Sequence, residues 1–292
     1  MSQDQQDDRS PIEGRRRQAT AGPVVPFGEE AFGPSSGTTL RWLGMAGFLL
    51  NTRGTTIAID PLLRDFDMPL LIDFPITTEA VPQLDAVLVT HSDNDHFSRP
   101  TCRHLAPVTD TFHSTHFVAS EMEREGIVPA MGHTIGGSFR VGATTVTVTP
   151  ADHAWQNEHP EPGQRHVDDD DACGFWLDTP DGSVWAPGDS RLIRDHHLAM
   201  PSPDALLFDF SDSEWHFTFD GAIEMANAYP DADLILHHWG SVDSPDFAPF
   251  NGDPADVLAA VDRPSRVRIL APGEPYELSR SSSARPVTDH TG

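Results

Sequence analysis

The sequence of 292 residues contains no lysine, only two cysteines and no long apolar run. The absence of lysine excludes Schiff-base catalysis and every lysine nucleophile. Two cysteines cannot form a disulfide framework, and Cys102 and Cys173 do not form a CxxC pair. We therefore expect both to be small buried apolar residues in a protein of a reducing compartment. No apolar run approaches the ~20 residues that a membrane helix requires, so no membrane-spanning segment is predicted.

An export signal is also not predicted. Arg15, Arg16 and Arg17 provide a basic stretch, but the residues that follow are Gln18-Ala19-Thr20-Ala21-Gly22-Pro23. A secretory signal has a longer apolar segment at this point. We therefore expect a cytoplasmic protein.

The charge balance limits the partners. The formal net charge is -26, and all 19 basic residues are arginine. Such an acidic surface repels nucleic acid and anionic membranes over a Debye length of about 8 Å at physiological salt. We expect a small molecule as the partner, and a homo-oligomer remains open.

The chain is long enough for a substantial core, and its pattern predicts one main domain over residues 38–278. Residues 1–37 and 279–292 lack apolar periodicity, which is typical of flexible tails. Between them, early strands come in hairpins and later strands alternate with helices. Strands are expected at 38–43, 48–51, 55–59, 86–90, 138–141, 144–149, 174–178, 183–185, 205–210, 233–236 and 267–270. Helices are expected from Ser98, at 120–125 before Gly126, at 220–228 and at 253–261. This order predicts two mixed sheets with helices outside them, an α/β or α+β architecture.

The hexapeptide His91-Ser92-Asp93-Asn94-Asp95-His96 is the most informative motif. It contains four potential metal ligands and directly follows the apolar run 86–90. A buried strand holds such a loop rigidly at one edge of a sheet, as divalent cations require. The alternative, a solvated acidic turn, is hard to reconcile with four ligand-type side chains in six residues.

Three further ligand-type residues follow predicted strands. His153 comes after the strand at 144–149, Asp189 after the strand at 183–185, and His238 at the end of the strand at 233–236. Each is weak evidence alone, but their order after the hexapeptide is specific.

With these residues the chain resembles the metallo-β-lactamase superfamily over residues 38 to 278, and most closely the branch related to L-ascorbate-6-phosphate lactonase. The resemblance is carried by the hexapeptide and by the phrases Trp42-Leu43-Gly44-Met45-Ala46-Gly47-Phe48, Ile59-Asp60-Pro61 and Pro272-Gly273-Glu274. It implies a four-layer αββα sandwich with a two-metal site along one rim of the paired sheets.

The resemblance also implies a ligand set. Transferred by position, the first metal ion is bound by His91, Asp93 and His153. The second is bound by Asp95, His96 and His238, and Asp189 bridges the two. His237 is left out, because neighbouring side chains of an extended strand point to opposite faces. Asp60 lies where the family has a carboxylate that orients a ligand loop, although a simple turn carboxylate is an equal alternative.

Asp93 departs from the family motif, which has histidine there. If Asp93 is a ligand, the donors are four histidines and three aspartates. Two divalent ions, three carboxylates and a bridging hydroxide then leave the site about neutral, which weakens it as a Lewis acid. Oxygen-richer ligation shifts the preference from zinc towards manganese or iron. We therefore predict that zinc is not uniquely favoured.

Two close cations bind a bridging water, lower its pKa and polarise a substrate oxygen. The sequence therefore predicts metal-dependent hydrolysis of an ester, lactone or phosphodiester, with Asp95, Asp189 and His216 as catalytic candidates. For His216, local capping or packing is the alternative. The loop 154–172 is expected to lie over the site. Its Trp155, Arg165 and His166, together with Arg191, are candidate contacts for an anionic substrate; a plain surface loop is equally compatible.

Other interpretations remain open. Superfamily members with a carboxylate at the position of Asp93 include diiron proteins that reduce dioxygen or nitric oxide, but those have glutamate there and usually a flavodoxin domain. A non-catalytic metal-binding relative is a third possibility. The run Asp168–Asp171 is expected to be a solvated loop rather than a third metal site, and Asp152 is expected to point away from the ligand His153.

Overall fold

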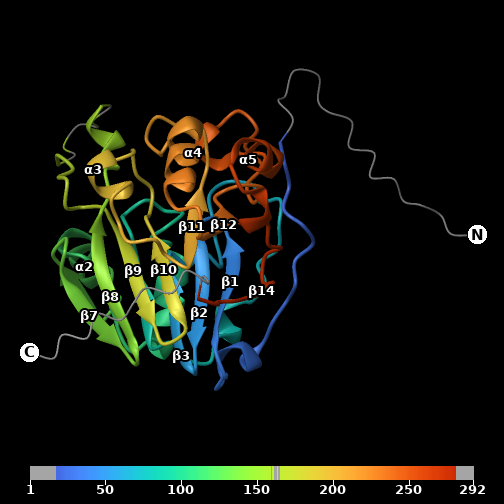
Figure 1. The fold of residues 1–292 in the computed structure, drawn as a ribbon. Helices are drawn as coiled ribbons and strands as arrows, with labels where there is room; N and C mark the ends of the chain where they lie inside the picture. Colours follow the sequence, from blue (N-terminus) through green and yellow to red (C-terminus); the bar gives the residue numbers. More distant parts are fainter. Residues whose placement is uncertain (1–17, 159, 161–162, 164, 281–292) are drawn as a thin grey trace, which may run out of the picture.

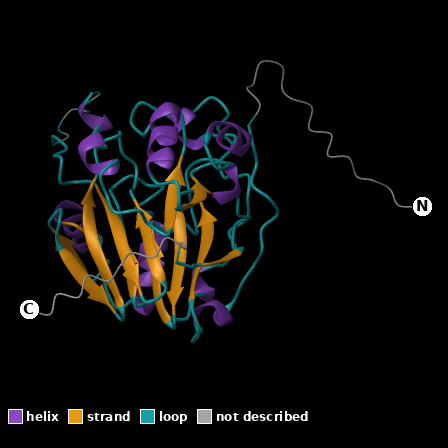
Figure 2. Ribbon diagram, in the orientation of Figure 1, coloured by secondary structure: helices purple, strands orange, loops and turns teal. Residues whose placement is uncertain are grey.

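The computed structural model describes residues 18–158, 160, 163 and 165–280. In these residues two seven-stranded sheets pack face to face (Figures 1 and 2). The first sheet has the order β14-β1-β2-β3-β4-β5-β6 and the second has the order β13-β12-β11-β10-β9-β8-β7.

The strands of the first sheet are β1 (Thr38–Gly44), β2 (Gly47–Thr52), β3 (Thr55–Ile59), β4 (Ala86–Leu88), β5 (Phe112–Thr115), β6 (Ala130–His133) and β14 (Pro275–Glu277). Those of the second sheet are β7 (Ser138–Val141), β8 (Thr144–Pro150), β9 (Cys173–Thr179), β10 (Gly182–Ala186), β11 (Ala205–Asp209), β12 (Asp233–His237) and β13 (Val267–Arg268).

Five α-helices accompany the described strands. They are α1 (Arg99–Leu105), α2 (His116–Arg124), α3 (Arg194–His197), α4 (Phe219–Ala228) and α5 (Pro254–Ala260). Ser98 caps α1 by accepting from the backbone N–H of Thr101, and Thr218 caps α4 by accepting from that of Gly221.

The direction of most strands follows the length of their connections. Short turns join β1 to β2, β2 to β3, β7 to β8 and β9 to β10, and these pairs are antiparallel. Strands β8 and β9 also pair antiparallel, although the long segment 151–172 connects them. Strands β3 to β6 and β10 to β13 are joined by longer crossovers and pair parallel. Both sheets are therefore mixed, as the sequence predicts.

The alternation of apolar side chains along β2 defines the layers. Phe48 and Leu50 belong to the core cluster between the two sheets, whereas Leu49 belongs to a second cluster. That second cluster includes Leu105 of α1 and Met122 of α2, so these helices cover the outer face of the first sheet. Residues of α4 join the core of the second sheet. The predicted αββα sandwich is confirmed.

The predicted N-terminal tail needs a correction. The structure describes it from residue 18, and residues 18–37, which were predicted to be part of a disordered tail, lie against the domain. Val25 donates its backbone N–H to Pro272, 2.8 Å away, and the buried Asn51 amide donates to the carbonyl of Ala31, also at 2.8 Å. The side chain of Phe32 is buried. Residues 1–17 and 281–292 lie outside the described residues.

Some elements differ from the sequence prediction. Strands β5, β6 and β14 and the short helix α3 were not predicted, and α2 begins four residues earlier than expected because Thr115 caps it. The buried state of Cys102 and Cys173 is confirmed. Among the described residues, no helix has both the length and the apolar character needed to cross a bilayer.

The topology brings several strand ends to one rim. In the second sheet β8 is antiparallel to β9 and β9 to β10, so β8 runs in the same direction as β10, β11 and β12. The carboxyl ends of these strands therefore share an edge, which faces the end of the molecule where α3, α4 and α5 gather in Figure 1. The loop after β4 reaches the same edge, because its His96 contacts Asp189 after β10. Residues far apart in the sequence thus meet at this rim.

Candidate metal centre

The hexapeptide forms a tight turn directly after β4. The backbone N–H groups of His96 and Phe97 both donate to the carbonyl of Asp93, at 3.0 and 2.7 Å. Phe97 is fully buried, and Ser98 then begins α1. The turn is therefore fixed at both ends, by the strand before it and by the helix after it.

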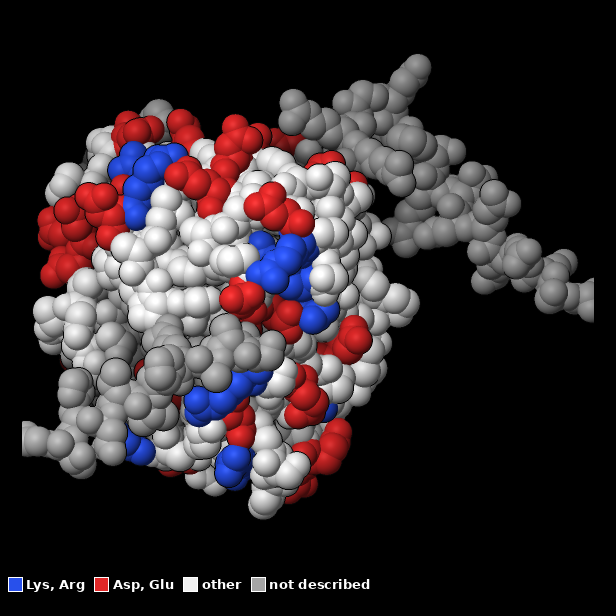
Figure 3. Space-filling model, viewed as in Figure 1, with Lys and Arg blue, Asp and Glu red and all other residues white. Residues whose placement is uncertain are grey.

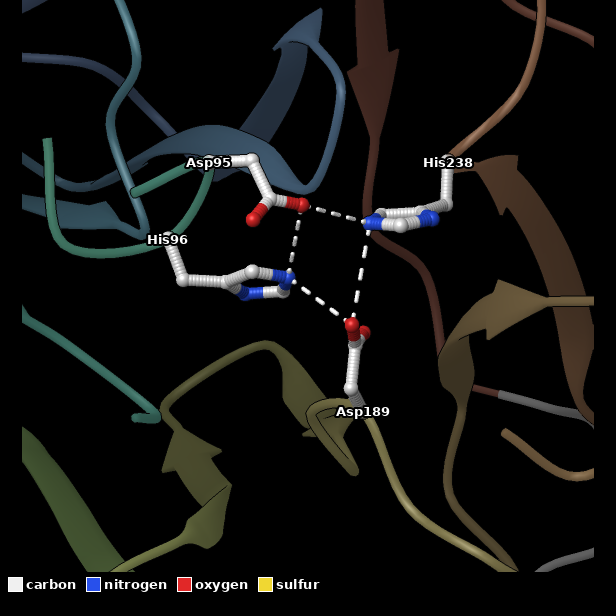
Figure 4. A group of neighbouring side chains, drawn as sticks. All are labelled: Asp95, His96, Asp189 and His238. Carbon is white, nitrogen blue, oxygen red and sulfur yellow. Dashed lines mark hydrogen bonds and ion pairs between the residues drawn. The ribbon is translucent and has the colours of Figure 1, made fainter. Parts of the chain in front are cut away.

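One group of potential ligands comprises Asp95, His96, Asp189 and His238, all buried (Figure 4). His96 Nε2 lies 3.1 Å from Asp189 Oδ2 and 3.4 Å from Asp95 Oδ2. His238 Nε2 lies 3.1 Å from Asp95 Oδ2 and 3.7 Å from Asp189 Oδ2. The four side chains come from three separate loops and point toward one another.

A second group comprises His91, Asp93 and His153. Asp93 Oδ2 lies 3.4 Å from His91 Nε2 and 3.2 Å from His153 Nε2. The imidazole rings of His91 and His96 are 4.1 Å apart between centroids, so the two groups adjoin. Asp189 belongs to the first group and also to a cluster with His153, which places it between the two.

The four imidazoles share one arrangement. In each, Nδ1 has a partner on the outer side, which leaves Nε2 directed at the aspartates. The partners are Thr90 Oγ1 for His91 at 3.0 Å, Asp60 Oδ2 for His96 at 2.8 Å, the Trp215 carbonyl for His153 at 2.9 Å and the Pro249 carbonyl for His238 at 2.6 Å. Outer partners of this kind fix ring orientation in metal-ligating histidines.

Asp60 orients two of these rings. Its carboxylate accepts from the backbone N–H of Thr90 at 2.8 Å and from the Thr90 hydroxyl at 2.7 Å, in addition to its contact with His96. The Thr90 hydroxyl in turn accepts from His91 when that ring carries its proton on Nδ1. The backbone at Asp60 has a φ of 42°, a strained conformation of the kind that occurs at functional sites.

The cluster fits a metal ion on two observations. His91 Nε2 and Asp189 Oδ1 are buried without any hydrogen-bond partner among the described residues. Buried polar atoms of this kind normally have a partner, and a cation between them would provide one. The donor set of imidazole nitrogens and carboxylate oxygens suits zinc, manganese and iron.

The shifted pKa values of the clustered aspartates and histidines reflect the attraction between their opposite charges. Burial works against ionisation of Asp189, but the neighbouring His216, His96 and His238 hold its pKa well below the usual range. Burial likewise opposes protonation of His238, yet the Asp189 charge and the hydrogen bond to Asp95 raise its pKa to about 9. For Asp93, burial is outweighed by hydrogen bonds from His153 and His91, and its pKa is also well below the usual range. Both carboxyl groups are thus held as anions, as metal ligation requires.

The two adjacent histidines at the end of β12 diverge as expected. His238 reaches the aspartates, whereas His237 points into the sheet interface, where its ring meets Phe48 edge-on at 5.6 Å. The backbone turns at His238, whose φ is 63°.

His216 lies beside the cluster, within 3.5 Å of Asp189 Oδ2 through its Nε2. Its Nδ1 is 2.5 Å from Asp209 Oδ2, at the end of β11. Asp209 was not predicted from the sequence. The available signal was its position at the end of a strand that reaches the rim.

The predicted substrate residues separate into two sets. Trp155 lies at the site, where its indole N–H donates to Asp93 Oδ2 at 2.8 Å; Gln156, which was not predicted, donates to Asp93 Oδ1 at 2.9 Å. Arg165 pairs with Asp168 and Asp171 on the surface.

The other two predicted contacts also lie away from the cluster. His166 is exposed. Arg191 pairs with Asp152 at 2.9 Å, and this pair explains why Asp152 points away from His153. The acidic run 168–171 is mostly exposed, and three of its carboxylates lie close together.

A cavity of about 740 Å³ opens over the cluster. Asp93, Asp95, His153, Asp189, His216 and His238 form its floor. Its walls come from four segments, around Phe66, Trp155, Trp215 and Phe250.

The comparisons with known proteins agree with this arrangement. Residues 55–239, more than half of the chain, match the family model described as "Beta-lactamase superfamily domain". A UPF0173 metal-dependent hydrolase of Rubrobacter xylanophilus is 33% identical over 64% of this chain and 75% of its own length. One of Archaeoglobus fulgidus is 28% identical over 82% of this chain and 99% of its own length.

Solved structures show the same fold. An isothiocyanate hydrolase from Delia radicum gut bacteria matches with a TM-score of 0.67 at 16% identity, over 83% of this chain and 100% of that one. A possible metal-dependent hydrolase from Veillonella parvula matches with a TM-score of 0.67 at 18% identity, over 84% of this chain and 100% of that one. The chain therefore belongs to the UPF0173 metal-dependent hydrolases of the metallo-β-lactamase superfamily.

Proposed function

We propose that this hydrolase uses a dinuclear metal centre to cleave an ester, lactone or phosphodiester bond. The observation that carries the proposal is the meeting of seven potential ligands in two adjoining groups, with Asp189 in reach of both. When bound, two divalent ions at such a site supply an acidified water and polarise the substrate oxygen.

The ligand roles follow the two groups. His91, Asp93 and His153 would hold one ion, and Asp95, His96 and His238 the other. Asp189 would be shared, since its Oδ2 lies 3.1 Å from His96 Nε2 and its Oδ1 has no partner among the described residues. The role of Asp60 in this proposal is to orient His96 directly and His91 through Thr90.

His216 is suited to proton transfer. Asp209 holds its Nδ1, so Nε2 faces the cavity floor. In ester hydrolysis the water oxygen bonds to the carbonyl carbon and loses a proton, the bond from that carbon to the alkoxy oxygen breaks, and the alkoxy oxygen takes up a proton. We assign to His216 Nε2 the transfer of the proton from the water to the alkoxy oxygen.

Finer predictions from the sequence stay predictions. They include the kinship with L-ascorbate-6-phosphate lactonase, the cytoplasmic location and a homo-oligomeric state. The choice among manganese, iron and zinc also remains a proposal, supported by the carboxylate of Asp93 at a position where the family has histidine.

Replacement of the shared carboxylate tests the dinuclear centre. We expect Asp189→Ala to lose bound metal and to lower hydrolysis of an aryl acetate by at least about a thousandfold, because one residue serves both ions. Elemental analysis and initial rates measure the two effects. Asp168→Ala, in the exposed acidic run, is the control and should change neither. A fully metallated and active Asp189→Ala protein would falsify the proposal.

A second candidate function is oxidation at a diiron centre, favoured by the oxygen-rich ligation that Asp93 provides. CmlA, a diiron beta-hydroxylase from Streptomyces venezuelae, matches with a TM-score of 0.64 at 15% identity, over 84% of this chain and 55% of that one. That likeness concerns the fold alone. Iron content measured together with oxygen consumption in the presence of a reductant separates the candidates. Hydrolysis by the iron form without oxygen uptake under these conditions eliminates oxidation.

A further inference from the structure

The cavity above the candidate metal centre has apolar, largely aromatic walls. The side chains that line it beyond the ligand cluster include Phe66, Met68, Trp155, Trp215, Phe247 and Phe250. Phe247 and Trp155 are 48% and 40% exposed, so large apolar surfaces stand open to a ligand in this cavity. A volume of about 740 Å³ lies within the range of small-molecule sites. The walls thus fit a ligand with an aromatic or similarly bulky apolar group.

Three carboxylates also line this cavity, in addition to those of the ligand cluster. They belong to Asp67, Asp212 and Glu214, and all three residues are exposed. Asp67 accepts from the Asn94 amide at 2.9 Å and Asp212 from the backbone N–H of Phe219 at 3.2 Å. None of the three forms an ion pair with a described arginine, so no described guanidinium compensates their negative charges.

No described arginine lines the cavity. The two described arginines that are nearest in sequence to its lining residues each pair with carboxylates that do not line the cavity. Arg191 stacks on the Trp215 ring at 4.5 Å and pairs with Asp152, while Arg64 pairs with Asp65 and Glu79. On the face seen in Figure 3, arginines likewise lie next to acidic side chains. Among the residues that the structure describes, an anionic substrate would therefore meet three carboxylates and no free guanidinium.

We propose that the substrate is an ester or lactone that bears an apolar aromatic-sized group and a positive charge. This inference rests on the proposed function and names its substrate class. With two divalent ions, three ligand carboxylates and one hydroxide, the metal centre is close to neutral, so Asp67, Asp212 and Glu214 set the charge of the cavity. Aromatic walls add cation–π attraction for an ammonium group. The expectation of an anionic substrate rested on Arg165, His166 and Arg191, none of which lines the cavity.

The experiment uses three aryl acetates that differ only in charge. They carry a para trimethylammoniomethyl, methoxymethyl or sulfonatomethyl group, whose methylene separates the charge from the ester. Each kcat/KM of the metal-loaded full chain is divided by the rate of hydroxide-catalysed hydrolysis of the same ester. We expect the cationic ester to exceed the anionic one by about a hundredfold at low salt, and the gap to narrow at high salt.

A charge-neutralised variant assigns the preference to the cavity. In Asp212→Asn/Glu214→Gln the ratio of cationic to anionic kcat/KM should fall at least about fivefold. The matched control is Asp110→Asn/Glu123→Gln, which removes the same charge from exposed positions outside the cavity and should keep the ratio. A ratio near one in the unaltered protein, or a ratio that both double variants change equally, overturns the inference.

Binding keeps the inference testable if none of these esters is cleaved. That result counts against the proposed function for simple esters. The charge preference of the cavity is then measured through the binding of three probes that differ in charge: benzyltrimethylammonium, benzyl alcohol and benzylsulfonate. Trp155 and Trp215 line the cavity, so quenching of tryptophan fluorescence reports occupancy. Tighter binding of the ammonium probe than of the other two supports the inference. Equal or tighter binding of the sulfonate overturns it.

Discussion

The two halves of the candidate metal centre differ in how far they are enclosed. In the half made by Asp95, His96 and His238, the side chains are 8%, 1% and 0% exposed. In the other half, His91 and His153 are equally buried, but the Asp93 side chain is 20% exposed. Both halves take ligands from the turn after β4, and the enclosed half adds His238 at the end of β12. In the open half, the Asp93 carboxylate accepts from the side chains of Trp155 and Gln156.

This difference concerns what can replace a lost ligand. In the open half water has access to the place of Asp93, and a water oxygen is an acceptable ligand for manganese or iron. In the enclosed half a lost ligand leaves buried imidazoles without a charge partner, which is costly. The enclosed half should therefore hold its ion more tightly, and the open half should exchange its ion and adapt to a substrate.

The largest expected effect compares the two unshared carboxylates. Asp95→Asn should reduce bound metal to about one ion per chain and lower hydrolysis by about a thousandfold, because no water replaces the buried ligand. Asp93→Asn should retain two ions, with faster exchange of one, and lose only about tenfold in rate. Elemental analysis, exchange with an isotopically labelled metal and initial rates measure these quantities. Equal losses in the two variants would contradict the comparison.

The next effect concerns Asp60, which reaches both halves at once through His96 and through Thr90 and His91. Asp60→Asn keeps the shape of the side chain but removes the charge that orients the two rings. Metal affinity should fall about 10- to 100-fold, as for other outer partners of ligand histidines. Competition with a chelator gives the affinity. The control is Asp85→Asn, which alters a carboxylate that accepts a hydrogen bond from β3 away from the site. If Asp60→Asn binds metal as tightly as the unaltered protein, His96 needs no orienting charge.

The metal-free protein should show a dependence on pH that metal abolishes. The folded-state pKa of His238 is raised to about 9, above its value of about 6.5 in an unfolded chain. Its protonated ring thus contributes stability that is complete below pH 6.5 and is lost as the pH rises to about 9. With metal bound, the neutral ring serves as a ligand and protons compete with the ion, so stability should rise over the same interval.

Thermal unfolding from pH 6 to pH 9 in a chelator and in the presence of metal measures both slopes. In His238→Gln the fall in the chelator should be smaller, because one proton-binding ring is gone. Parallel curves with and without metal would contradict the assignment of His238 to the cluster.

The sequence predicted which residues meet at the rim more completely than it predicted the individual strands, and the reason lies in the positions of those residues along the chain. The seven predicted ligands follow strands with clear apolar runs, so the topology brings His91, His153, Asp189 and His238 to one rim. Strands β5 and β6 were missed because their residues, Phe-His-Ser-Thr and Ala-Met-Gly-His, show no alternation. Pairing of β5 with β4, and of β6 with β5, makes them strands, and this tertiary cause leaves no local signal.

Long-range contacts also explain the errors around the cavity. Residues 18–37 have no periodicity, yet they lie on the domain through backbone hydrogen bonds that composition does not encode. Arg165 and Arg191 have the chemistry of substrate contacts, but Asp171 and Asp152 bind them elsewhere. The fold determines which carboxylate an arginine pairs with, so the charge of an arginine does not by itself predict that it contacts the substrate.

The smallest expected effect tests whether the open half sets the choice of metal. Asp93→His restores the histidine of the family motif and replaces a carboxylate oxygen by an imidazole nitrogen. The variant and the unaltered protein are each given an equimolar mixture of zinc and manganese. The ratio of bound zinc to bound manganese should be about five- to tenfold higher in the variant, because nitrogen ligands favour zinc. Trp155→Phe is the control for the lost indole contact, since it removes that hydrogen bond to Asp93 and leaves the ligand type unchanged. If Trp155→Phe shifts the ratio as far as Asp93→His does, the packing around the open half, and not the carboxylate, determines which ion it holds.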